Sequence, residues 1–208
     1  MGTKAKTSGW AVMCLFALAI TGYALTMLGA PHLRTPFIQA LFGSVPIAVI
    51  LHLAGGATAL ATGAFQFNTA LRNRRLNLHR WLGRCYVIAV LIGGGAAFAL
   101  ALRSTGGIPT HFGFGLLAVL WIGSTLNAYR HIRARHVVQH RQWMIRSYAL
   151  TLAAVTLRIY LPLSLAAGLP FEPVYITVSW LCWVPNLVFA EWWWVPRSVT
   201  QPTGTLSS

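Results

Sequence analysis

The hydrophobic residues of this chain fall into six long runs separated by short polar segments. The runs cover about residues 10–30, 44–67, 81–102, 109–129, 143–167 and 173–195. Each has roughly the 20 mostly apolar residues that a helix needs to cross a bilayer. Nearly all of the charge lies between the runs. The pattern predicts an all-α protein, a polytopic bundle of six transmembrane helices in one integral membrane domain (1–197), followed by a disordered C-terminal tail (198–208).

The basic residues give the predicted helices a direction. If six helices alternate, thirteen of the sixteen Lys and Arg residues fall on one side of the membrane, and Arg34 and Arg103 fall on the other. Basic residues in short loops stay in the cytoplasm, so both termini are expected there, in a multi-pass protein of the inner (plasma) membrane. The thirteen are Lys4, Lys6, Arg72, Arg74, Arg75, Arg80, Arg84, Arg130, Arg133, Arg135, Arg141, Arg146 and Arg197.

The charge balance excludes several classes of function. A net charge of +14 could indicate nucleic acid, but these arginines flank apolar helices, where they meet anionic lipid headgroups. The bilayer is therefore the expected partner, and nucleic acid is not. The chain has no Asp and two Glu, Glu172 and Glu191. Paired-carboxylate catalysis, carboxylate metal sites and an acid-oriented Ser hydrolase therefore lack their side chains.

Four histidines lie at or near the ends of four successive predicted helices. His52 lies inside the second helix, and His79, His111 and His140 open the third, fourth and fifth. If the helices alternate, His52 and His111 share the outer half of the bilayer, and His79 and His140 share the cytoplasmic half. Two imidazoles that face each other at one depth can hold a b-type haem. The alternative is an interfacial or packing role, which suits His52 least because a polar ring inside a spanning helix is costly.

Helix geometry places the outer pair unevenly. His52 lies ~12 Å from the outer start of its predicted helix, and His111 lies within ~5 Å, so a helix tilt or a later true start of the helix is needed to level them. Glycine follows three of the four histidines by four residues, at Gly56, Gly83 and Gly115. Positions i and i+4 share a helix face, which would leave a bare patch beside each ring. Close packing of membrane helices also uses small residues, and this is the alternative explanation.

Arg158 is a second polar group inside a predicted helix, in the outer half near the depth of His52. A buried arginine requires an anionic or carbonyl partner. A haem propionate, a quinone headgroup, a lipid phosphate or a backbone carbonyl could serve, or the side chain could reach the outer interface instead. Pro162, four residues on, is expected to kink this helix near its outer end.

Several strings resemble a known family. They lie in segments 52–67, 78–84, 140–150 and 183–192, and include His-Arg-x-x-Gly-Arg from His79 and His-Arg-x-Trp-Met-x-Arg-Ser from His140. Over about residues 40–195 the chain resembles an uncharacterised family of bacterial membrane proteins called domain of unknown function 2306. This resemblance implies a membrane protein and assigns it no activity.

A more distant resemblance concerns the histidines. The string Leu-His-x-Trp-x-Gly at 78–83, and histidines on helices two to five, are similar to the two-haem cytochrome b-561 type. This resemblance implies that His52 pairs with His111, and His79 with His140, as axial ligands of haem b. The chain departs from that pattern in its shorter histidine spacings of 27, 32 and 29 residues, which move the cytoplasmic pair toward the interface.

Two hypotheses of different classes follow. In the first, the protein moves electrons within the membrane through haem, with quinone as a redox partner and Arg158 holding an anionic or quinone group. In the second, it is a non-enzymatic carrier of a small molecule or lipid, or an assembly partner of another membrane complex, without haem.

Overall fold

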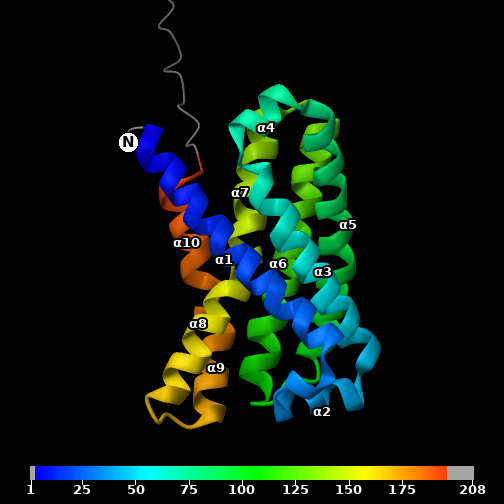
Figure 1. The fold of residues 1–208 in the computed structure, drawn as a ribbon, viewed down its shortest axis with the longest axis vertical. Helices are drawn as coiled ribbons and strands as arrows, with labels where there is room; N and C mark the ends of the chain where they lie inside the picture. Colours follow the sequence, from blue (N-terminus) through cyan, green and yellow to red (C-terminus); the bar gives the residue numbers. More distant parts are fainter. Residues whose placement is uncertain (1–2, 196–208) are drawn as a thin grey trace, which may run out of the picture.

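The computed structural model describes residues 3–195, and these residues are almost all helical (Figure 1). The predicted all-α bundle is confirmed. The tail predicted at 198–208 lies outside the described residues, as do residues 196 and 197. Within the described residues, six helical segments are long and apolar enough to cross a membrane: Ser8–Gly29, Pro46–Gln66, Leu76–Ala101, Ile108–Arg133, Val137–Ala166 and Phe171–Trp193.

Four of the spans form a ring, and the others lie around it. The ring order is α3, α5, α6 and α7, closed because α7 also contacts α3. Helix α1 crosses the bundle diagonally and packs on α3, while α9 and α10 lie beside α6 and α7 (Figure 1). The elements are α1 (Thr3–Gly29), η1 (Pro31–Leu33), α2 (Pro36–Ser44), α3 (Pro46–Gln66), α4 (Thr69–Arg74), α5 (Leu76–Ala101), α6 (Ile108–Arg133), α7 (Val137–Thr151), α8 (Ala153–Ala166), α9 (Phe171–Leu181) and α10 (Val184–Trp193).

The basic residues predict which end of the bundle faces the cytoplasm, and on that prediction the end that carries α4 is called cytoplasmic and the end that carries α2 is called outer. The helices extend further toward the cytoplasmic end than hydropathy predicts. Helix α5 begins at Leu76 instead of residue 81, α6 ends at Arg133 instead of 129, and α7 begins at Val137 instead of 143. The added turns are polar and charged, which a helix tolerates outside the hydrocarbon core but which hydropathy assigns to loops. This correction moves His79 and His140 to the fourth positions of α5 and α7.

Helix α2 closes the outer end of the bundle and is missing from the hydropathy pattern. The Thr35 hydroxyl accepts a hydrogen bond from an amide of the first turn, and Pro36 opens the helix. This Thr-Pro pair is a recognisable helix start. Phe37 packs against the rings of Phe171 and Tyr175, so α2 reaches across to α9.

Arg34, one of the two outer arginines, caps the C-terminus of α1. Its Nε donates to the Met27 carbonyl (2.8 Å) and its Nη2 to the Leu28 carbonyl (3.2 Å). The guanidinium also lies 3.6 Å from the centre of the Phe42 ring. Because the last carbonyls of a helix have no partner within it, this arginine has a structural role.

The fifth and sixth spans are both interrupted part-way across the membrane. Helix α7 passes to α8 at Leu152, and α9 passes to α10 at residues 182–183. Thr156 Oγ1 lies 3.0 Å from the Leu152 carbonyl and 2.6 Å from the Cys182 carbonyl, and Asn186 Nδ2 donates to Thr156 Oγ1 (2.9 Å). Backbone groups freed inside a membrane need such partners. Pro162, where the sequence predicts a kink, lies ten residues after the first interruption, inside α8.

Helices α3 and α5 touch backbone to backbone. A Cβ added to Gly55 would lie 2.7 Å from Gly93 Cα and 2.7 Å from the Ala89 carbonyl oxygen. A Cβ on Gly113 would lie 2.5 Å from Ser179 Oγ of α9. Membrane helices associate through close van der Waals contact, and Gly55 and Gly113 allow such contact at these positions.

We expect Gly55→Ala to destabilise the protein by about 1–3 kcal/mol, because its methyl group would overlap backbone atoms of α5. Gly56→Ala is the matched control. An added Cβ there meets nothing within 4 Å, and alanine favours the helix by up to about 1 kcal/mol. Thermal unfolding in detergent, followed by circular dichroism, measures both variants. Equal stabilities would contradict the backbone contact.

Candidate functional site

The segments that carry the family resemblance meet in the cytoplasmic half of the bundle. Gln66, at the end of α3, donates from Nε2 to the His79 carbonyl (3.4 Å). Arg146 of α7 forms an ion pair with Glu191 of α10, in which Nη2 donates to Oε2 (3.0 Å) and Nε to Oε1. Two parallel N–H···O bonds fix the orientation as well as the charge. Strings far apart in the sequence therefore build one region.

His79 of α5 and His140 of α7 lie across the ring from each other, close enough to interact electrostatically. His140 Nδ1 donates to the Ala128 carbonyl of α6 (2.8 Å), so its Nε2 is the nitrogen left for a ligand. In the part of the chain that the structure describes, His79 Nδ1 is buried without a hydrogen-bond partner. Arg72 lies within electrostatic range of His79. The region thus offers two imidazoles with a cation beside them.

The outer histidines are held differently. His52 Nδ1 donates to the Gly93 carbonyl of α5 (3.2 Å), and His111 Nε2 donates to the Ser104 carbonyl in the loop before α6 (2.9 Å). Since a carbonyl oxygen can only accept, each bond fixes which ring nitrogen carries a proton. His52 therefore presents Nε2 to its surroundings, whereas His111 presents Nδ1.

The three glycines that follow histidines by four residues, Gly56, Gly83 and Gly115, are less crowded than Gly55 and Gly113, which lie in helix contacts. An added Cβ would meet nothing within 4 Å at Gly56, and at Gly115 it would meet only the Phe98 ring, at 3.9 Å. At Gly83 the nearest atom would be Gln66 Oε1, at 3.5 Å. Each of the three histidines therefore has uncrowded backbone one turn away, as the sequence suggested.

Arg158 lies in the outer half, eight residues or roughly 12 Å before the end of α8 at Ala166. Its Nη1 donates to the Ala154 carbonyl (2.9 Å), and its guanidinium lies 5.1 Å from the centre of the Tyr23 ring. It is also within electrostatic range of His52. Its Nε is buried, with no hydrogen-bond partner among the described residues.

A hydrogen-bonded core separates the two histidine pairs. Tyr86 Oη lies 2.7 Å from Ser147 Oγ and 2.8 Å from Thr151 Oγ1. Trp121 Nε1 donates to Thr151 Oγ1 (2.8 Å), and Thr125 Oγ1 lies 2.6 Å from Ser147 Oγ. All five side chains are buried, and they tie α5, α6 and α7 together across the middle of the ring.

Sequence reasoning missed this core, because Ser and Thr in membrane helices commonly bond to carbonyls of their own helix. A signal was nevertheless present. Tyr86 follows His79 by seven residues, and Ser147 follows His140 by seven. Seven residues are about two helical turns, so each pair shares a face.

Comparison with family models identifies the family of this chain. Residues 49–194 match a family described as "Predicted membrane protein (DUF2306)", which covers well over half of the chain. The chain belongs to the DUF2306 family. No curated protein and no solved structure matches this DUF2306 protein. The family resemblance found in the sequence is confirmed, whereas the likeness to two-haem cytochromes b-561 gains no support.

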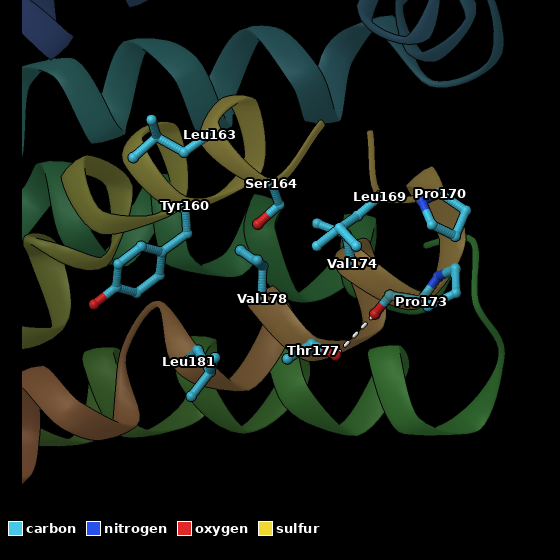
Figure 2. Close-up of a pocket in the computed structure, with 10 residues that line it drawn as sticks. All are labelled: Tyr160, Leu163, Ser164, Leu169, Pro170, Pro173, Val174, Thr177, Val178 and Leu181. Carbon is cyan, nitrogen blue, oxygen red and sulfur yellow. Dashed lines mark hydrogen bonds between the residues drawn. The ribbon is translucent and has the colours of Figure 1, made fainter. Parts of the chain in front are cut away.

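A groove of about 420 Å³ lies between α8 and α9 in the outer half of this DUF2306 protein (Figure 2). The Ser164 hydroxyl points into the space between the two helices, while Thr177 Oγ1 donates to the Pro173 carbonyl (2.8 Å) (Figure 2). Tyr160 lines one end, and most of the other lining side chains are apolar. None of the four candidate histidines lines this groove, and neither does Arg158.

Removal of one hydroxyl tests the buried core. We expect Tyr86→Phe to destabilise the DUF2306 protein by about 1–3 kcal/mol, because Ser147 and Thr151 lose a buried partner. Tyr160→Phe removes the same atom from a side chain that is 37% exposed, and should change stability by no more than about 0.5 kcal/mol. The free energy of unfolding in detergent distinguishes the two. Similar values for both variants would mean that the core contributes little.

Proposed function

We propose that this protein is a b-type haem protein that transfers electrons within the membrane, with His79 and His140 as axial ligands. The observation that carries the proposal is that the two histidines lie in the first turns of α5 and α7, which stand opposite each other in the ring of helices. A ligating histidine almost always donates its other N–H to a carbonyl or carboxylate. His140 does so to Ala128, and His79 adds a buried nitrogen without a partner among the residues that the structure describes.

The surroundings of His79 also suit a haem group. Haem carries two anionic propionates, and Arg72 lies within electrostatic range of His79. Gly83, one turn further on, leaves the backbone uncrowded. When bound, haem supplies one-electron chemistry at its iron, and the protein tunes it through ligands, hydrogen bonds and burial. In this chain, the histidines would hold the iron and the arginine would balance the propionates.

The outer pair, His52 and His111, stays a prediction for a second haem. Gly56 and Gly115 leave room beside both rings. His111, however, uses Nε2 to bond the Ser104 carbonyl, so ligation through that nitrogen would require this bond to break. The proposal therefore rests on the cytoplasmic pair.

Absorption spectra test the proposal directly. We expect protein purified from haem-sufficient cells to show a reduced-minus-oxidised band of bis-histidine haem. His79→Ala and His140→Ala should each remove about one haem per chain, because a site built from two axial imidazoles loses one of its two bonds to the iron. His136→Ala is the matched control. This histidine is exposed and lies at the same end of the bundle as His79 and His140. Its ring packs against the ring of His131, with centroids 5.9 Å apart. Wild-type protein without a haem band, or equal haem in all three variants, would refute the proposal.

A carrier of lipid or another small apolar molecule is the second candidate function, and the groove between α8 and α9 favours it. Eight of the ten residues that line the groove belong to the spanning parts of α8 and α9, where an acyl chain can enter from the bilayer. If the protein is such a carrier, Ser164→Phe should fill the groove and lower the binding of a spin-labelled phospholipid at least about tenfold. Thr58→Phe, an exposed position on α3, serves as the control. Unchanged lipid binding by Ser164→Phe would remove this candidate.

A further inference from the structure

Arg158, in the outer half of the bundle, is a partly buried cation without an anionic partner among the described residues. Arg158 Nε has no hydrogen-bond partner among the described residues. The chain contains no Asp, Glu191 is bonded to Arg146, and Glu172 is exposed in the first turn of α9. A charged group inside the bilayer is costly and, by default, indicates a functional site. The Ala154 carbonyl accepts from Nη1, but it carries no net charge, so the counterpart of the Arg158 charge and of Nε should come from a ligand.

His52 adds an acceptor beside this donor. The Gly93 carbonyl can only accept, so His52 Nδ1 carries the proton and Nε2 of the neutral ring has a lone pair. Tyr23 of α1 presents its ring to the Arg158 guanidinium at 5.1 Å. Helices α1, α3 and α8 thus contribute an aromatic ring, an acceptor and a cationic donor, and His52 and Arg158 are within electrostatic range.

All three side chains lie at a similar depth. Tyr23 is six residues before the end of α1, His52 is six residues after the start of α3, and Arg158 is eight residues before the end of α8. These separations correspond to roughly 9–12 Å from the outer helix ends. Lipid phosphates and soluble anions stay near the headgroups, outside the hydrocarbon core. A ligand at this depth needs polar oxygens on an otherwise apolar body, which describes a quinone.

We propose that Tyr23, His52 and Arg158 bind the headgroup of a membrane quinone. Arg158 donates to a ring carbonyl of the quinone, and His52 Nε2 accepts from a hydroxyl of the reduced form. Binding is argued from these contacts alone, whereas electron exchange with a haem at His79 and His140 rests on the proposed function. The assignment competes with a second haem for His52, because a nitrogen that ligates iron cannot accept a hydrogen bond.

The test is the binding of decylubiquinone to the purified protein in nanodiscs of quinone-free lipid, followed by quenching of Trp fluorescence. We expect saturable binding by the wild type. Arg158→Gln should raise the Kd about tenfold or more, as expected for the loss of one charge-assisted hydrogen bond. Arg103→Gln, an exposed arginine on the same side, should leave the Kd within about twofold.

Several outcomes would overturn the quinone site. They are an absence of saturable binding by the wild type, and equal Kd values for Arg158→Gln and Arg103→Gln. A third is loss of haem from Arg158→Gln with its Kd unchanged, because the arginine would then serve a haem propionate. If Arg158→Gln does not fold, His52→Ala takes its place with the reduced form, decylubiquinol, as the ligand, and an unchanged Kd there overturns the site equally. Haem-free wild-type protein that binds decylubiquinone would support this site and refute the proposed function.

Discussion

The contact between α3 and α5 determines much of the arrangement around it. Gly55 and Gly93 meet with no room for a side chain, so the two backbones are closer than ordinary side chains permit. This approach brings the Gly93 carbonyl within reach of His52. Two turns further toward the cytoplasm, Gly63 leaves space for the Tyr148 ring, whose hydroxyl donates to a carbonyl of α3 (3.1 Å). The same glycine face therefore orients the outer histidine and closes the ring against α7.

Inside a membrane each polar group needs a protein partner. The centre of this bundle meets that requirement with no excess of hydrogen-bond donors. The core of Tyr86, Trp121, Thr125, Ser147 and Thr151 makes six contacts, including two to backbone carbonyls. Four hydroxyls and one indole N–H supply only five protons, so one contact always lacks a proton of its own. Toward either side of this core lies a buried nitrogen with no partner among the described residues, His79 Nδ1 and Arg158 Nε. Ligand binding is thus expected at these flanks, and not in the packed centre.

The spans could be predicted from the sequence because crossing a bilayer imposes length and apolarity on each segment separately. Features that depend on contacts with a second helix could not be predicted from the sequence. The interruption at Leu152 is stable because Thr156 and Asn186 bond the carbonyls around it, and Asn186 comes from another span. In the site, His52, His79, His140 and Arg158 were identifiable individually as polar groups in or beside apolar helices. Which of them face each other depends on helix rotation, which a single sequence does not contain.

The two halves of the membrane consequently differ in chemistry. From the sequence, the cytoplasmic pair looked interfacial, but α5 and α7 begin earlier than hydropathy predicts, and both His79 and His140 lie on the first turns of helices that face across the ring. In the outer half, His52 lies near a cation, while His111 is bonded to the loop before α6. A pair of imidazoles suits a metal centre, whereas one imidazole beside a cation suits an oxygen-bearing ligand. The proposed electron transfer from a donor dissolved in the bilayer would use both kinds of site, one on each side of the packed core.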